Sequence, residues 1–173
     1  MSEILKGKVA IVTGSGQGIG RAVAEDLAAH GAKILVVDPG LSLDGNVENA
    51  SLADEVVAGI IKAGGDAKSN KSSVASFESG QEIVQDAIDS FGRLDIVVTV
   101  AGILRDRMIF NMTEEEWHDV IDVHLTGTFS IVRHAAPIFR AQKSRCLLLS
   151  TLFYPFKIII LKVNSIKYIR EPI

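Results

Sequence analysis

The stretch TGSGQGIG, residues 13–20, constrains the fold more than any other, because it places four glycines within eight residues. It follows the apolar run VAIV and precedes RAVAEDLAAH, which has the apolar spacing of a helix. A glycine-rich turn between a strand and a helix lets the backbone approach a diphosphate, and the first turn of the helix offers N–H groups to the phosphates. The stretch therefore predicts a nucleotide-binding turn. The simpler alternative is a glycine-rich turn without a ligand.

The glycine spacing differs from the common dinucleotide fingerprint G-x-G-x-x-G. It reads Gly14-x-x-x-Gly18-x-Gly20, with Gly16 as an additional glycine. The physical requirements are the same, since a glycine can adopt positive φ and its missing Cβ lets other backbone come close. Gly20 is expected to let the helix pack closely on the strand.

Asp38 ends the second strand-like run, AKILVVD at residues 32–38. An acidic residue at this distance from the glycines meets the adenosine ribose, accepts hydrogen bonds from its hydroxyls and repels a 2′-phosphate. Asp38 thus predicts NAD(H) in preference to NADP(H). The alternative is that Asp38 only starts a turn with Pro39 and Gly40.

Strand and helix patterns alternate along the chain up to about residue 150. This alternation predicts parallel strands joined by right-handed crossovers. The fold class is therefore α/β, a Rossmann-type doubly wound parallel sheet that is incomplete at its C-terminal side. Thr113 and Glu116 predict a capping box, Ser51 predicts a helix cap, and Pro137 predicts a kink or break. The expected strands span 8–13, 32–38, 67–70, 94–102 and 146–150, and the expected helices span 20–30, 51–63, 77–91 and 113–139.

Composition excludes several classes of protein. The chain has 173 residues, 47% of them apolar, and a formal net charge of -3. This charge argues against a nucleic-acid partner, and Pro155 and Lys157 interrupt the apolar run 146–163, which argues against a membrane span. The single cysteine, Cys146, excludes an internal disulfide and indicates a reducing, cytoplasmic location. His30, His118 and His134 lack ligand spacing with acids or cysteine, so no metal site is predicted.

The glycine pattern, the run VVD at 36–38 and VVTVAGILRDR at 97–107 together resemble the short-chain dehydrogenase/reductases. The stretches GGDAKSN (64–70), FGRLDIVVTVAGILRDR (91–107) and VHLTGTF (123–129) are similar to the (3R)-hydroxyacyl-CoA and 17β-hydroxysteroid dehydrogenase branch. The resemblance covers residues 4–150 and implies hydride transfer between a nicotinamide and a secondary alcohol or ketone, perhaps of a hydroxyacyl thioester, as a small-molecule substrate. By position it implies that the cofactor is held by Gly14, Gln17, Gly18, Ile19, Gly20, Asp38, Ser73, Val74, Ala101 and Gly102.

The chain departs from the family pattern beside the cofactor. Where the family has Asn-Asn-Ala-Gly after the fourth strand, this chain has Thr99 and Val100 before the Ala-Gly pair, and two side-chain amides are lost. Ser72 stands where an acidic residue is usual near the adenine. His124 occupies the position of a catalytic asparagine in many members. The alternative for His124 is a helix residue packed against the sheet.

The family's catalytic Ser, Tyr and Lys are also altered. A Lys at i+4 from the Tyr shares its helix face and favours the phenolate, which exchanges a proton with the alcohol. Here Ser150 or Thr151 is the candidate hydroxyl, and Tyr154 and Lys157 are the candidate pair, although Lys157 follows at i+3. The alternative is that the tyrosines pack among apolar residues.

The chain changes character near Arg145, so we predict an NAD-binding domain over 1–151 and a divergent apolar and basic tail over 152–173. The tail suggests a truncated, alternatively spliced or frame-shifted product. The β-prone run KIIILKV, residues 157–163, has no predicted partner, which leaves the fifth strand as an uncovered edge. The alternative to a dehydrogenase is an inactive nucleotide binder or a dimer partner of a full-length relative through helix 113–141. A homo-oligomer is also consistent with the sequence.

Overall fold

The computed structural model describes residues 3–41, 49, 51–143, 147–150 and 159–161. These residues form a sheet with the strand order β3-β2-β1-β4-β5-β6. Neighbouring strands from β3 to β5 pair in parallel, and β6 pairs antiparallel with β5. The strands are β1 (Val9–Thr13), β2 (Lys33–Val37), β3 (Asp66–Asn70), β4 (Ile96–Thr99), β5 (Leu147–Ser150) and β6 (Ile159–Leu161).

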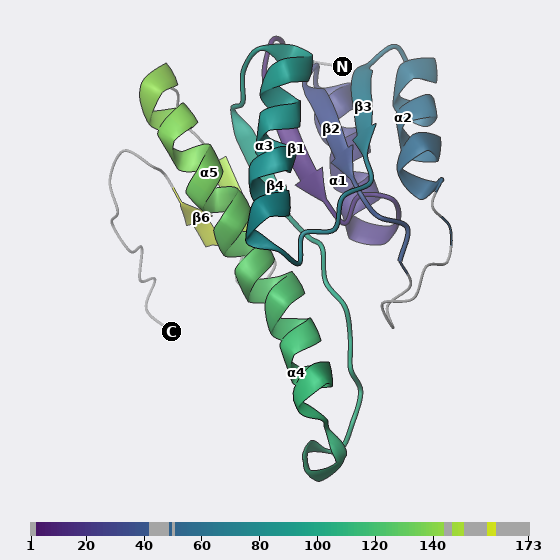
Figure 1. The fold of residues 1–173 in the computed structure, drawn as a ribbon. Helices are drawn as coiled ribbons and strands as arrows, with labels where there is room; N and C mark the ends of the chain where they lie inside the picture. The colour runs from purple at the N-terminus through teal and green to yellow at the C-terminus, as the bar shows by residue number, and fades with distance from the viewer. Residues whose placement is uncertain (1–2, 42–48, 50, 144–146, 151–158, 162–173) are drawn as a thin grey trace, which may run out of the picture.

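Helices cover both faces of the sheet, as a doubly wound fold requires (Figure 1). Helices α1 and α2 pack on one face, and α3 and α5 pack on the other. The helical segments are α1 (Gly18–Ala29), α2 (Leu52–Lys62), α3 (Phe77–Phe91), η1 (Ile109–Asn111), α4 (Glu114–Ile121), η2 (Asp122–Thr126) and α5 (Gly127–Gln142). The predicted α/β Rossmann-type fold is therefore confirmed.

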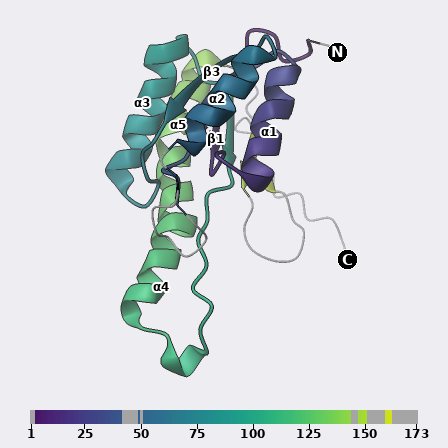
Figure 2. The same ribbon diagram turned by 90° about the vertical axis from the view of Figure 1, so that its right-hand side faces the viewer.

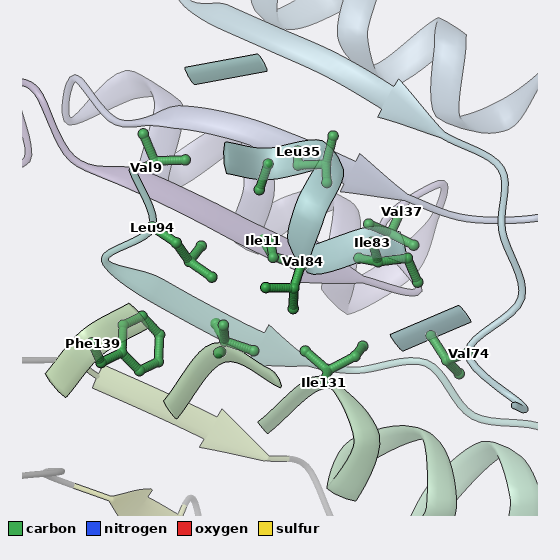
Figure 3. Close-up of a cluster of buried hydrophobic side chains, with 13 residues drawn as sticks. Val9, Ile11, Leu35, Val37, Val74, Ile83, Val84, Leu94, Ile131 and Phe139 are labelled. Carbon is green, nitrogen blue, oxygen red and sulfur yellow. The ribbon is translucent and has the colours of Figure 1, made fainter. Parts of the chain in front are cut away.

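The alternation of side chains along each buried strand divides the core into two layers. In β1, Ile11 joins the cluster beneath α3 and α5, whereas Val12 joins the cluster beneath α1 and α2. Both side chains are fully buried. Figure 3 shows the first cluster, which runs from Leu94 and Phe139 at one end to Val74 at the other. Because every position of such a strand is buried, the strand reads in sequence as a continuous apolar run.

The helix ends follow local sequence signals in most cases. Thr113 and Glu116 form the predicted capping box, in which each side chain accepts a hydrogen bond from the other residue's backbone N–H. The N–H of Thr113 and the guanidinium of Arg107 lower the pKa of the Glu116 carboxyl. Ser51 occupies the predicted N-cap position of α2, but its hydroxyl lies within donating distance of Asn49 Oδ1 and Glu55 Oε1 and makes no capping bond with the helix backbone.

The long helix that follows Thr113 is irregular at a place the sequence did not indicate. A kink or break at Pro137 is predicted, and the break is wrong, because α5 runs through Pro137 without interruption. Ala135 and Phe139 on either side of Pro137 are buried against the sheet, and this packing holds the helix together across the missing N–H. The irregularity lies earlier, in η2, which is a π-helical turn that contains His124. Figures 1 and 2 show α4 and the loop before it extending beyond the sheet.

The edge of the sheet also differs from the prediction. Strand β6 pairs with β5, with Ser150 opposite Ile159 and Leu148 opposite Leu161. The expectation of an uncovered fifth strand without a partner for the 157–163 run is therefore wrong. The reason is that a β-prone segment lying close behind a strand in sequence can pair with it antiparallel, without a crossover helix.

Candidate functional site

A cavity of about 700 Å³ opens at the carboxyl ends of β1, β2 and β4. The strand order reverses between β1 and β4, since β1 leads to β2 on one side while β4 and β5 lie on the other. This reversal creates a crevice at the strand ends, where α/β sheets bind ligands. The lining residues are Gly14, Gln17, Gly18, Ile19, Gly20, Val37, Asp38, Pro39, Leu41, Ser73, Val74, Val100, Ala101, Gly102, Ile103 and Val123.

The glycine-rich turn is packed too closely to hold larger residues. Gly14 has a φ of +64°, and a Cβ there would lie 2.7 Å from the Cα of Ala101. A Cβ on Gly20 would collide with the carbonyl oxygen of Gly14. The absence of these two side chains thus brings β1, the start of α1 and the loop after β4 together around the cavity.

Helix α1 begins at Gly18 and points its N-terminus into the cavity. The N-cap residue Gln17 makes no side-chain capping bond, and the first turn carries no acidic residue. The first N–H groups of a helix have no partner within it and carry the positive end of its dipole. Gln17, Gly18 and Ile19 are exposed beside the cavity, so this end of α1 suits a phosphate.

The carboxylate of Asp38 closes the opposite side of the turn. Asp38 is only 7% exposed. Its Oδ2 accepts a hydrogen bond from the Gly16 N–H at 2.8 Å, and its Oδ1 accepts one from the Gly40 N–H at 2.8 Å. The turn predicted for Asp38 with Pro39 and Gly40 is therefore present, and the same carboxylate also lines the cavity.

Thr13 and Ser15 attach the turn to its neighbouring strands. The Ser15 hydroxyl donates to the Val12 carbonyl at 2.6 Å and accepts from the Val37 N–H at 3.0 Å. The Thr13 hydroxyl accepts from the N–H groups of Val100 at 3.1 Å and Ala101 at 3.2 Å. Thr13 thereby fixes the loop after β4 through backbone contacts, although the chain lacks the asparagines that the family pattern has there.

Replacement of Thr13 by valine keeps the shape of the side chain and removes its oxygen. We expect the free energy of unfolding to fall by about 1–3 kcal/mol, because two part-buried N–H groups lose their acceptor. Thr13→Ser keeps the hydroxyl and serves as the control. Urea denaturation followed by circular dichroism measures both variants, and equal stability of Thr13→Val and Thr13→Ser would contradict the role of this oxygen.

His124 lies beside the far end of the cavity, on η2. Its Nε2 is 3.1 Å from the Ile103 nitrogen and 2.9 Å from the Ile103 carbonyl oxygen, so the tautomer decides whether it accepts or donates. A Cβ on Gly102 would collide with the imidazole ring. The side chain is half-buried, and it braces the loop after β4. The alternative to catalysis was packing against the sheet, whereas the contacts of His124 are to Gly102 and Ile103 of the loop after β4.

The adenine-end candidates come from the segment after β3. Val74 is 6% exposed and belongs to the core cluster in Figure 3, while Ser73 is exposed at the cavity rim. The Ser72 N–H donates to Asn70 Oδ1 at 2.9 Å. All ten residues predicted to hold the cofactor therefore line one cavity, although they come from four separate stretches of the chain.

Of the predicted catalytic residues, the structure describes His124 and Ser150. Ser150 ends β5 opposite Thr99 of β4, at the carboxyl edge of the sheet. Thr151, Tyr154 and Lys157 lie outside the described residues.

Two arginines of the loop after β4 are attached to α4. Arg105 forms an ion pair with Asp119 at 2.7 Å, and Arg107 forms one with Glu116 at 2.9 Å.

Sequence reasoning missed several residues of this site. Ser15 and Gly16 were not assigned roles, and Thr13 was used only as part of a motif. Their bonds join residues 22 to 88 positions apart in sequence, so no local pattern could indicate them.

Within the described ranges, no helix combines the length and hydropathy needed to cross a membrane.

Comparison with known proteins gives consistent matches. The sequence model of the short chain dehydrogenase family matches residues 8–147. A peroxisomal hydratase-dehydrogenase-epimerase of Saccharomyces cerevisiae is 46% identical over 138 residues, which are 80% of this chain and 15% of the relative. A hydroxyacyl-CoA dehydrogenase of Mycobacterium tuberculosis is 43% identical over 136 residues, which are 79% of this chain and 41% of the relative.

A crystal structure of a short chain dehydrogenase from Mycobacterium avium superimposes with a TM-score of 0.77 and 43% sequence identity. The match covers 85% of this chain and 52% of the crystallised one. The chain thus spans about half or less of the length of these relatives.

Proposed function

The chain belongs to the short-chain dehydrogenase family, and from this premise we propose that its cavity binds NAD(H) for an oxidoreductase reaction. The reaction class is hydride transfer between the nicotinamide and a secondary alcohol or ketone. When bound, the nicotinamide supplies the hydride acceptor or donor. The protein's own residues bind and orient the dinucleotide and its substrate.

One observation carries the proposal: the residues expected to hold a dinucleotide line a single cavity at the strand-order reversal. The fit to a diphosphate rests on the turn itself. The glycine-rich backbone leaves room where a Cβ on Gly14 or Gly20 would collide, and the N-terminus of α1 faces the same space. Pyrophosphate would lie on this turn, with the adenosine toward Asp38 and Ser73 and the nicotinamide toward Gly102.

Asp38 supports NAD(H) in preference to NADP(H). Each carboxylate oxygen of Asp38 has one backbone hydrogen bond and retains acceptor capacity for a ribose hydroxyl. The negative charge would repel a 2′-phosphate at close range. Among the described residues that line the cavity, none is an Arg or Lys that could pair with such a phosphate.

The substrate is proposed as a 3-hydroxyacyl thioester, because one relative is named a hydroxyacyl-CoA dehydrogenase and the sequence resembles that branch. His124 and Ser150 are the described candidates for positioning the substrate oxygen, with Thr151, Tyr154 and Lys157 as sequence candidates. A second function, nucleotide binding without turnover, is favoured by one observation: Lys157 follows Tyr154 at i+3 instead of i+4. A cytoplasmic location belongs to the same proposal. So does association with a full-length relative through residues 113–141, or formation of a homo-oligomer.

Titration of the protein with NADH and NADPH, followed by nicotinamide fluorescence and by calorimetry, tests the cofactor assignment. We expect NADH to bind at least about tenfold more tightly than NADPH, a difference of ~1.4 kcal/mol that a single charge repulsion can supply. Absence of binding of either dinucleotide by a folded protein would refute the proposal. Tighter binding of NADPH would refute the role of Asp38.

Absorbance at the NADH band after addition of NAD and a 3-hydroxyacyl thioester then separates the two candidate functions. Turnover supports the dehydrogenase, and binding without turnover supports the inactive nucleotide binder.

A further inference from the structure

Asp38 makes two contacts that a ribose ligand does not need. Its Oδ2 accepts from the Gly16 N–H and its Oδ1 accepts from the Gly40 N–H, both at 2.8 Å. Gly16 lies inside the glycine-rich turn, 22 positions before Asp38 in sequence. A carboxylate that accepts backbone N–H groups forms charge-assisted hydrogen bonds, which are shorter and stronger than neutral ones. The side chain is only 7% exposed, so little water competes with them.

The absence of a side chain at Gly16 is explained by the same contact. Gly16 is not among the residues with positive φ, so its backbone conformation does not require glycine. A Cβ at Gly16 would lie 2.8 Å from the Cγ of Asp38 and 2.8 Å from the Cβ of Leu52. Glycine is therefore needed at residue 16 because the carboxylate and the start of α2 occupy the adjoining space.

Resting on the proposed function, we propose that Asp38 is a positioning residue for the diphosphate-binding turn as well as a ligand of the ribose. Its carboxylate joins the end of β2 to the turn between β1 and α1. Removal of this carboxylate therefore weakens binding of the diphosphate as well as of the sugar. It follows that a single substitution at residue 38 lowers affinity for both dinucleotides and does not simply convert NAD(H) preference into NADP(H) preference.

An NADH analogue whose adenosine lacks the 2′- and 3′-hydroxyls separates the two roles, because it retains the diphosphate and offers Asp38 no ribose hydroxyl. Calorimetry measures its affinity and that of NADH for the wild-type chain and for Asp38→Ala, Asp38→Asn and Asp66→Ala. Asp66 is exposed at the opposite end of the sheet and controls for the loss of one negative charge.

We expect Asp38→Ala to bind the analogue at least about tenfold more weakly than wild type, since the charge-assisted bond to Gly16 of the turn is lost together with the bond to Gly40 that orients the carboxylate. Asp38→Asn retains one oxygen that accepts one of the two N–H groups, so it should recover part of this loss. Asp66→Ala should match the wild type with both ligands. Equal affinity of Asp38→Ala and wild type for the analogue would overturn the inference while leaving NADH binding by the wild type intact.

Gly16→Ala provides a second route if Asp38→Ala does not fold, as judged by circular dichroism. The added methyl displaces the turn from Asp38 but keeps the carboxylate for the ribose. We expect the same fold loss of affinity for NADH and for the analogue. Wild-type affinity of Gly16→Ala for both ligands would overturn the inference, whereas failure of the wild type to bind NADH would overturn the proposed function and the inference together.

Discussion

Gly20→Ala is expected to weaken NADH binding at least about a hundredfold, which corresponds to ~2.7 kcal/mol. It is also expected to lower the free energy of unfolding by about 1–3 kcal/mol, the usual cost of overpacking. The added methyl would collide with the carbonyl oxygen of Gly14, and neither atom can rotate away, because the oxygen is backbone and the Cβ position is fixed by the backbone of residue 20. Helix α1 must therefore move away from β1, and its N-terminus moves with it out of reach of the diphosphate.

Gly59→Ala is the matched control for this experiment. Gly59 lies within α2, and a Cβ there meets nothing within 4 Å. Alanine in a helix interior is better than glycine by about 0.5–1 kcal/mol, so this variant should be more stable and bind NADH unchanged. Calorimetry and urea denaturation measure both variants. If Gly20→Ala binds NADH as tightly as Gly59→Ala does, the turn is not the diphosphate site.

Asp95→Ala is expected to lower the free energy of unfolding by about 1–3 kcal/mol at neutral pH, because the buried Val9 N–H loses its acceptor and two half-exposed cations lose their anion. Asp95 is 1% exposed and accepts hydrogen bonds from the Val9 N–H, Lys8 and Arg93. The variant leaves the Val9 N–H without its side-chain acceptor at the beginning of β1 and removes the anion that faces two cations.

The contribution of Asp95 should depend on pH in a defined direction. Burial by itself raises the pKa of the Asp95 carboxyl, but hydrogen bonds from Arg93, Val9 and Lys8 outweigh burial, and the net pKa is lowered. A carboxyl with a lowered folded-state pKa stabilises the fold above its unfolded pKa of about 3.9, and this stabilisation is lost as the pH falls through the folded-state pKa. The difference between wild type and variant should therefore be largest near neutral pH and shrink below pH ~4.

Asp89→Ala controls for the removal of a carboxylate. Asp89 is exposed on α3, where it accepts a hydrogen bond from Gln85. Its loss should change the free energy of unfolding by less than about 0.5 kcal/mol at any pH. Urea denaturation at several pH values compares the three proteins. A constant difference between wild type and Asp95→Ala from neutral to acid pH would show that the Asp95 charge does not contribute as described.

The cofactor side of the site was predictable from sequence because it depends on short, local requirements. Gly14, Gly18 and Gly20 lie within one turn, and a turn between a strand and a helix leaves few residue types possible. The parallel sheet then placed Asp38 and Ala101 beside that turn, since the carboxyl ends of adjacent parallel strands meet at one edge. The glycine motif indicated the site clearly because backbone geometry limits which residue types can occupy each of these positions.

The bonds that hold the site could not be read in the same way. Gly16 appeared to be a surplus glycine until its position against Asp38 was known, and the two N–H groups held by Thr13 belong to a strand end 87 and 88 residues away. The break predicted at Pro137 was wrong for a related reason. Local propensity favours an interruption there, whereas burial of Ala135 and Phe139 maintains the helix.

The sequence by itself determined the order of strands and helices along the chain, the α/β class and the glycine-rich turn at the cavity. These follow from apolar periodicity and from the backbone freedom of glycine, which act over a few neighbouring positions. The tertiary structure alone decided which donors meet the Asp38 and Thr13 oxygens, where the long helix becomes irregular and which strand covers β5. These are contacts between distant segments, and their energies depend on distances that exist only after the chain has folded.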